Sequence, residues 1–418
     1  MYDGIIVGGG PAGMMAAITA ATYGKRIALI EQNPELGRKM RLTGGGRCNI
    51  TNNKTVHDFI DHLPTRNGRF LYHALQVFGP RQIMDYFTSR GVPLKVEDHD
   101  RVFPVSNRSL DLIMALERDL KSRRVDLFLA TRVESISNTD SIKTIKTNRG
   151  PLLGKQLVIA TGGQSYPHTG STGFGYHWAH QQGIAVTPVY PAETPILASN
   201  AWVQSKDLQG LTFKDVILRL LDDKGAVIKQ QRHDLIITHF GISGPAALML
   251  SQFVYHDLKQ HDTASLELDV FPDYPVDLLA QELLDHKRSY PQKTLLNGLD
   301  RYGPKRFMQV VLEEAAIPPH LPFAHLRKTQ AQAIAHLLKH FSITAIGVKP
   351  LPYAFVTGGG IDLKEIDPKT MECKRKKGVF FVGEVLDLHG YTGGYNMTIA
   401  LATGYIAGQA IGQSDSPY

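Results

Sequence analysis

Residues 4–13, GIIVGGGPAG, decide the fold of this chain. The apolar run at residues 4–7 stops at Gly8-Gly9-Gly10-Pro11-Ala12-Gly13, and an alanine-rich helical pattern follows. A second apolar run, residues 26–30, ends at Glu31, which lies 18 residues after Gly13. Strand, glycine turn, helix, strand and carboxylate in this order are typical of a dinucleotide site. A lone GxGxxG is weak evidence, but with every part in register the sequence predicts such a site here.

Each residue of this fingerprint has an expected role. Gly8 allows the tight turn, Gly10 leaves room for a pyrophosphate, and Gly13 lets the helix pack closely on the strand. Backbone N–H groups at the helix start bind the negative charge, and Glu31 accepts hydrogen bonds from a ribose. The contacts predicted in this part of the chain are Gly8, Gly10, Pro11, Ala12, Gly13, Glu31 and Gln32.

Composition is that of an ordinary globular enzyme. At 418 residues, with 43% hydrophobic and 20% charged residues, the chain should split into two or three domains. No apolar run is long enough to span a bilayer, and the early strand argues against a secretory signal, so we expect no membrane association. Two cysteines, Cys48 and Cys373, give no disulfide framework, which predicts a cytoplasmic protein.

The net charge of +7 and a pI near 9.1 raise the possibility of a nucleic-acid partner. The basic residues are scattered, however, and the densest cluster, residues 374–377, fits a hairpin loop. We therefore expect a small-molecule substrate and no nucleic acid. The sequence carries no signal of the oligomeric state.

The order of patterns along the chain predicts a discontinuous domain. Short β-type runs alternate with helical patterns up to residue 190 and resume after residue 350. Between them lie a β-rich stretch and a helical one. The simplest organisation is a nucleotide-binding domain, 1–190 and 350–418, with an inserted β-rich subdomain, 191–272, and an inserted helical subdomain, 273–349.

The C-terminal segment distinguishes FAD from NAD. Residues 378–384, GVFFVGE, predict a strand leading to Gly383 and Glu384, and a helix starts near Asn396. FAD is too long for one βαβ unit, and its flavin end needs a second strand, turn and acid. Glu384 would accept from the ribityl or pyrophosphate region, and the helix would direct its positive end at the N1–C2=O edge of the flavin. An ordinary strand–loop–helix connection is the alternative. The contacts predicted here are Gly383, Glu384, Asp387, Gly394, Tyr395 and Asn396.

Two further glycine loops add candidates. Residues 42–49, LTGGGRCN, place Gly44 and Gly45 where backbone can lie flat against a ring, and Arg38, Lys39 and Arg47 can neutralise phosphate or flavin charge. A flexible basic loop is the alternative. For Cys48 we favour packing or flavin contact over thiol chemistry, because no second cysteine is near. The strand at 156–160 ends in Thr161 and Gly162, which can touch the FAD.

Three residues beside glycine-rich turns are candidates for the substrate side: Tyr166, His239 and Tyr391. A lone histidine such as His239 is more often structural than catalytic. Ser243 lies in a GxSxG-like stretch that lacks the last glycine, which argues against hydrolase chemistry. The 17 histidines show no metal-ligand spacing, so no metal is expected.

GIIVGGGPAG, GRKMRLTGGGRCNITN, THFGISGP and GVFFVGEVLDLHGYTGGYNMTIALATGYIAG together resemble the BaiN-type bacterial NAD(P)/FAD-dependent flavoproteins over essentially the whole length. The resemblance implies an α/β fold: a glutathione-reductase-like FAD-binding Rossmann domain interrupted by β-rich and helical subdomains. It adds Val133, whose strand lies against adenine in related flavoproteins, and it implies FAD contacts at Gly8, Gly10, Gly13, Glu31, Arg38, Lys39, Gly44, Gly383, Glu384 and Asn396. The 160–176 stretch is also similar to fumarate reductases and aspartate oxidases. Their flavin-tethering histidine has no match here, so FAD is expected to be non-covalent.

The predicted function is that of an FAD-dependent oxidoreductase. NAD(P)H would give hydride to FAD, and the flavin would pass it to an organic acceptor such as an activated C=C bond. No second Rossmann unit is evident, so NAD(P)H would be a transient co-substrate. The alternatives are a flavoprotein acting on RNA, a non-catalytic flavin-binding redox sensor and an aromatic hydroxylase.

Overall fold

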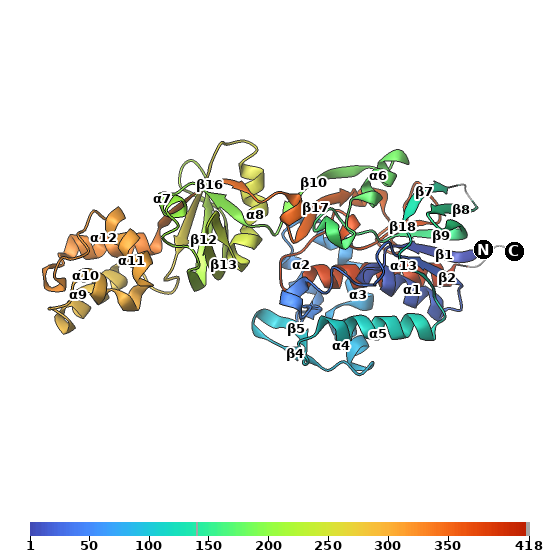
Figure 1. Cartoon of the computed structure of the whole chain (residues 1–418), viewed down its shortest axis with the longest axis horizontal. Coiled ribbons are helices and arrows are strands. Elements are labelled where there is room, and N and C mark those ends of the chain that lie inside the picture. Colours follow the sequence, from blue (N-terminus) through green and yellow to red (C-terminus); the bar gives the residue numbers. More distant parts are fainter. Residues whose placement is uncertain (139–140, 415–418) are drawn as a thin grey trace. The chain divides into compact units, whose positions relative to one another are not determined.

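The computed structural model describes residues 1–138 and 141–414. The chain divides into two units (Figure 1). Unit 1 comprises Met1–Tyr190 and Leu351–Tyr418, and unit 2 comprises Pro191–Pro350. Each unit is described by itself.

A parallel sheet forms the centre of unit 1. Its strands run in the order β6-β2-β1-β9-β18. Their bounds are β1 Tyr2–Val7, β2 Ile27–Ile30, β6 Asp126–Phe128, β9 Gly150–Ile159 and β18 Val379–Phe381. Val7 lies between Ile30 and Ile159, and Phe381 pairs with Ile159. Fully apolar strands such as residues 27–30 suit this position, because both faces of a parallel sheet are covered.

The first half of β9 carries an antiparallel extension. Strands β7 (Val133–Asn138) and β8 (Lys143–Thr147) form a meander that joins β9 along residues 150–154. The long strand β9 therefore belongs to both parts of the sheet.

Helices from the two ends of the chain pack together in unit 1. Figure 1 shows α1 (Pro11–Thr22, blue) beside α13 (Tyr395–Gln413, red). A Cβ at Gly404 would overlap the carbonyl oxygen of Ala12, and one at Gly408 would overlap that of Ala16. These two glycines, one turn apart on α13, thus allow the backbones of α13 and α1 to come into contact. The C-terminal helix is thereby held against the helix of the first βα unit.

The rest of unit 1 consists of short elements around this sheet. The helices are α2 Val56–Asp61, α3 Tyr72–Phe78, α4 Pro80–Thr88, α5 Ser109–Ser122 and α6 Phe174–Gln181. The strands are β3 Thr51–Asn52, β4 Leu94–Val96 and β5 Arg101–Pro104 in a small antiparallel sheet, and β17 Val356–Ile361, which pairs with β10 Val186–Ala192.

Unit 2 is a closed β-barrel with helices packed on it. The strand order is β11-β14-β13-β12-β15-β16. Their bounds are β11 Ile196–Ala198, β12 Thr212–Leu221, β13 Val227–Thr238, β14 Gly241–Ser243, β15 Ala264–Asp269 and β16 Phe341–Val348. The helices are α7 Ala201–Gln204, α8 Pro245–Asp257, α9 Val276–Ser289, α10 Leu295–Gly298, α11 Lys305–Glu314 and α12 Lys328–Lys339.

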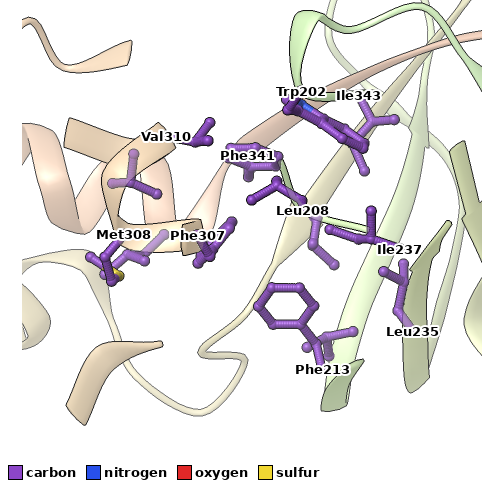
Figure 2. Packing of buried hydrophobic residues seen from close by; sticks show 14 of the residues in the cluster. Trp202, Leu208, Phe213, Leu235, Ile237, Phe307, Met308, Val310, Phe341 and Ile343 are labelled. Carbon is purple, nitrogen blue, oxygen red and sulfur yellow. The ribbon is translucent and has the colours of Figure 1, made fainter. Parts of the chain in front are cut away.

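One hydrophobic core joins the barrel to these helices. Figure 2 shows Phe307 of α11 between Phe213 of β12 and Phe341 of β16. The ring centroids are 4.9 Å apart for Phe213 and Phe307 and 5.1 Å apart for Phe307 and Phe341. The β-rich and helical stretches therefore lie in one unit. The range expected to be helical, 273–349, ends in strand β16, whose alternating side chains Phe341, Ile343 and Ala345 face the core.

The structure confirms the α/β fold class. The final helix, expected over 396–409, extends over Tyr395–Gln413. Within residues 1–138 and 141–414, no helix is long and apolar enough to cross a membrane. The same residues contain no group of three or more His, Cys, Asp or Glu side chains able to hold a metal ion.

Candidate cofactor site

The carboxyl ends of the parallel strands bring the predicted residues to one edge of the sheet. Gly8 follows β1, Glu31 follows β2, and Ala160 follows β9. Strand β1 pairs with β2 on one side and with β9 on the other. The order of the strands therefore changes direction at β1, and α/β sheets bind ligands in the crevice at such a point. Gly8 has φ of +112°, and a Cβ on it would overlap the Ala160 carbonyl oxygen. The turn therefore requires glycine.

The N-termini of α1 and α13, like those of α3 and α6, lack capping side chains. Helix α1 begins after Gly10 and α13 after Gly394; neither has a side-chain cap or an acidic residue in its first turn. The N–H groups of a first helical turn have no partner within the helix and carry partial positive charge. A Cβ built on Gly10 would meet nothing within 4 Å, so there is space above the first turn. Both ends are suited to anionic or electron-rich groups.

Glu31 is held at the end of β2 by nearby amides. Its Oε2 accepts from the Gly9 N–H at 2.8 Å, and its Oε1 accepts from the backbone N–H and side-chain amide of Asn33 at 2.8 and 2.7 Å. A carboxylate has about four lone-pair sites, so capacity remains for ribose hydroxyls. The N–H of Thr131 donates to the Glu31 carbonyl at 2.9 Å. Strand β7 begins two residues later, at Val133.

Two neighbours of Glu31 are engaged by the protein itself. The Gln32 side-chain amide donates to the Gly170 carbonyl at 2.8 Å. The Arg38 guanidinium donates to Asn33 Oδ1 at 2.8 Å and is exposed.

An ion pair joins residues 345 positions apart in the chain. Lys39 Nζ lies 2.7 Å from Glu384 Oε2, and the two side chains are 21% and 19% exposed. Glu384 Oε1 also accepts from Ser165 Oγ at 3.0 Å and from the Thr357 N–H at 2.9 Å. Burial favours the neutral acid, but the Lys39 charge and these hydrogen bonds outweigh it and hold the pKa of Glu384 below its ordinary value. Two residues predicted separately thus form one charged pair.

The TGGG loop combines open backbone with a structurally bound arginine. Gly44 and Gly45 are exposed and left-handed, with φ of +57° and +66°. Arg47 lies 3.0 Å from Glu97 and stacks on Phe103 with its guanidinium carbon 4.0 Å from the ring centroid. Glu97 also lies 2.9 Å from Lys95, so one carboxylate is shared by two cations.

Cys48 is fully buried, and burial raises the pKa of its thiol to about 11. A thiol with this pKa is a poor nucleophile at neutral pH. The environment agrees with a packing role.

Buried polar atoms do not single out the crevice. Thr161 Oγ1 and Asn52 Nδ2 have no hydrogen-bond partner among the described residues, but neither have Trp202 Nε1 and Tyr302 Oη of unit 2. Asn52 is fully buried in β3, beside Thr51, whose Oγ1 is 2.8 Å from Oγ1 of Thr398 in the first turn of α13. These atoms are covered by the protein itself, so they do not mark a ligand site.

Predicted residues at the start of α13 organise the loop before it. Asn396 accepts from the Gly390 N–H at 2.9 Å and donates to the Gly390 carbonyl at 2.8 Å. The Tyr395 ring packs on Phe59 with centroids 4.8 Å apart. Burial raises the pKa of Asp387, partly offset by a hydrogen bond with Thr187. These contacts fix the N-terminus of α13.

The three substrate-side candidates fall in different places. Tyr166 is left-handed, with φ of 51°, directly after Ser165, and its ring centroid is 5.7 Å from that of Phe355. Tyr391 is buried in the loop before α13. His239 belongs to unit 2, on the turn between β13 and β14, with its ring 4.9 Å from that of Phe240. The structure thus brings Tyr166 and Tyr391 into the unit that contains Glu384, and His239 into the other.

Comparison with known proteins gives the family. Residues 2–410 match the model described as "HI0933-like protein Rossmann domain". The chain belongs to this family. It is 29% identical to a ribosomal RNA dihydrouridine synthase of Haemophilus influenzae, over 98% of each chain. It is 27% identical to a 3-dehydro-bile acid delta(4,6)-reductase of Clostridium scindens, over 97% of this chain and 98% of that one.

Solved structures show the same fold. The 3-ketosteroid-delta4-(5alpha)-dehydrogenase of Rhodococcus jostii RHA1 superposes with a TM-score of 0.54 and 13% identity, over 99% of this chain and 97% of that one. The 3-ketosteroid delta1-dehydrogenase of Sterolibacterium denitrificans gives a TM-score of 0.51 and 15% identity, over 99% and 100%. The predicted family resemblance is confirmed, and the chain is a flavoprotein oxidoreductase with a Rossmann FAD-binding fold. The roles of individual site residues stay predictions.

Proposed function

We propose that this protein reduces a C=C bond conjugated to a carbonyl group, with hydride supplied by NAD(P)H. The observation that carries the proposal is the Lys39–Glu384 pair, which joins segments from opposite ends of the chain in unit 1, where helices α1 and α13 also pack together. When bound there, FAD supplies reversible hydride acceptance and donation.

In this proposal, different residues of unit 1 contact different parts of FAD. Glu31 accepts from the ribose, with the β7 start at Val133 beside the adenine. The N-terminus of α1 and Arg38 face the pyrophosphate, and Glu384 accepts from the ribityl region. The N-terminus of α13 stabilises negative charge at the N1–C2=O edge. In this arrangement Lys39 keeps Glu384 ionised and therefore able to accept.

The names of two relatives share one chemistry. Dihydrouridine is uridine whose C5–C6 double bond, conjugated to a carbonyl, has gained two hydrogens. A delta(4,6)-reductase also reduces ring C=C bonds. We propose the same class of acceptor here, with Tyr166 and Tyr391 of unit 1 on the substrate side. A free pyridine nucleotide would reach the flavin transiently. The free, buried cysteines suit a reducing, cytoplasmic location.

An anaerobic titration tests the proposal. The purified protein, loaded with FAD, is mixed with NADH and then with NADPH while the 450 nm flavin band is followed. We expect one of them to bleach the band, and 4-androstene-3,17-dione or a uridine-containing RNA to restore it with formation of the reduced product. A band that neither nucleotide bleaches would favour the non-catalytic redox sensor. Reoxidation only by oxygen, with a hydroxylated product, would favour the hydroxylase.

RNA is a second candidate acceptor because relatives at 29% and 28% identity are named ribosomal RNA dihydrouridine synthases. The charge distribution bears on it. Unit 2 contains 17 basic and 17 acidic residues, so the whole excess of +7 lies in unit 1. Salt-sensitive RNA binding with a steep slope would support this candidate.

A further inference from the structure

We propose that Tyr166, Tyr353 and Phe355 form an aromatic face that seats a flat, uncharged, fused-ring enone. This inference rests on the proposed function and names the substrate class that the same site takes. It assigns a binding role to Tyr353 and Phe355, which the sequence motifs did not single out.

Two of the three aromatic side chains are open to solvent, and Tyr166 is half-buried. Tyr353 is 64% exposed and Phe355 is 46% exposed. The rings of Tyr166 and Phe355 are inclined at 56° with centroids 5.7 Å apart, and the Tyr166 N–H donates to the Pro352 carbonyl at 3.3 Å. Backbone therefore ties residue 166 to the segment 351–355. Large aromatic residues exposed together indicate a binding surface more often than an isolated one does.

Serine 165 connects this face to the charged pair of the cofactor site. Ser165 Oγ donates to Glu384 Oε1 at 3.0 Å and lies 3.4 Å from the Phe355 carbonyl oxygen. The next strand begins one residue later, and its Thr357 N–H donates to the same Glu384 oxygen. The aromatic face thus borders the part of the crevice assigned to the flavin half of the cofactor.

The charge pattern selects a neutral ligand. Residues 161–190 and 351–361 contain no Asp, Glu, Lys or Arg. Eight basic residues of unit 1 lie before the parallel strands β2, β6 and β18, at the amino edge of the sheet: Lys25, Arg26, Arg123, Arg124, Lys374, Arg375, Lys376 and Lys377. The cation beside the aromatic face, Lys39, is paired with Glu384. A polyphosphate chain needs cations where it binds, whereas flat apolar rings pack well on aromatic side chains.

Binding of a named probe to the oxidised, FAD-loaded protein tests the inference. Equilibrium dialysis with 4-androstene-3,17-dione is run on the wild type, Phe355→Ala, Tyr353→Ala and the control Tyr72→Ala, an equally exposed tyrosine on α3. We expect Phe355→Ala to raise the Kd at least tenfold and Tyr353→Ala several-fold. Tyr72→Ala should leave it unchanged, and all four proteins should retain the same flavin content and Tm.

Unchanged Kd in the two face variants would overturn the inference. So would a wild type that ignores the enone, including one that binds a uridine-containing RNA in its place. No reductant is present, so failure of hydride transfer, which would refute the proposed function, does not affect this readout.

Discussion

Removing Lys39 should destabilise unit 1 in a pH-dependent way. In Lys39→Met the Glu384 carboxylate keeps its bonds from Ser165 and Thr357 but loses the ammonium group 2.7 Å away. A buried ion left without its partner costs about 3–5 kcal/mol. Glu384 is one-fifth exposed and retains two donors, so we expect the lower end, about 3 kcal/mol.

This loss converts into a measurable shift in melting temperature. For a unit of this size, 1 kcal/mol corresponds to about 2–4 °C, so the variant should melt about 6–12 °C lower at pH 7. Arg26→Met is the control, because Arg26 and Asp126 are 63% and 47% exposed at 3.7 Å. Such a surface pair contributes at most about 1 kcal/mol.

The pH dependence follows from the sign of the pKa shift. In the wild type the folded pKa of Glu384 lies below its unfolded value, so its contribution is complete above about pH 4.3 and is lost as pH falls through the folded pKa. In Lys39→Met, burial dominates and raises that pKa above the unfolded value. Protonation then stabilises the folded variant as the pH falls.

The difference in melting temperature between the two proteins should therefore shrink from pH 7 toward pH 4. Differential scanning fluorimetry across this range, with and without FAD, measures it. A drop below about 2 °C at pH 7, or a drop that does not change with pH, would refute the reasoning.

Three further predictions concern the turn, the thiol and the C-terminal loop. Gly8→Ala should lower the free energy of unfolding by about 3 kcal/mol and abolish FAD retention. The control is Gly24→Ala, where φ is also positive but the added Cβ meets nothing within 4 Å, so the loss should be only about 1 kcal/mol. Equal losses in chemical denaturation would contradict this. Cys48, with its thiol pKa of about 11, should resist a disulfide reagent at pH 8 in the folded protein and react after denaturation. Rapid labelling of the folded protein would show that burial does not protect this thiol. Asn396→Ala releases both hydrogen bonds to Gly390 and should weaken FAD binding about tenfold, with the loss of about 1.4 kcal/mol measured by fluorescence titration; unchanged affinity would show that the loop is held by other contacts.

Local patterns were sufficient for much of unit 1. The turn at Gly8 depends on a requirement for φ above zero, and the apolar runs at 27–30 and 379–381 form the buried strands that parallel pairing needs. These features are encoded within a few residues.

The ion-pair partners of charged side chains could not be predicted from local sequence in the same way. The structure pairs Arg47 with Glu97, which comes from a loop fifty residues later, and this partner was not predicted; the role of Arg47 toward a cofactor stays a prediction. Lys39 and Glu384 were predicted as separate contacts, and their pairing depends on docking of segments from opposite ends of the chain. Strand β16 closes the barrel by pairing with β11 and β15, which lie in the stretch predicted to be a separate β-rich subdomain.

The same long-range docking links folding of unit 1 to its cofactor. The residues proposed to hold the two halves of FAD are separated by the whole of unit 2 in sequence, and they are brought together by contacts that include those of α13 with α1 and the pairing of β18 with β9. A ligand that contacts both halves binds the docked state alone, and at 100 times its Kd adds about 2.7 kcal/mol of stability. The Lys39–Glu384 pair stabilises the same docked state through charges from both ends of the chain. FAD and the ion pair therefore both stabilise the docked state. When the ion pair is weakened, FAD retention should depend more strongly on the contacts of the C-terminal helix α13.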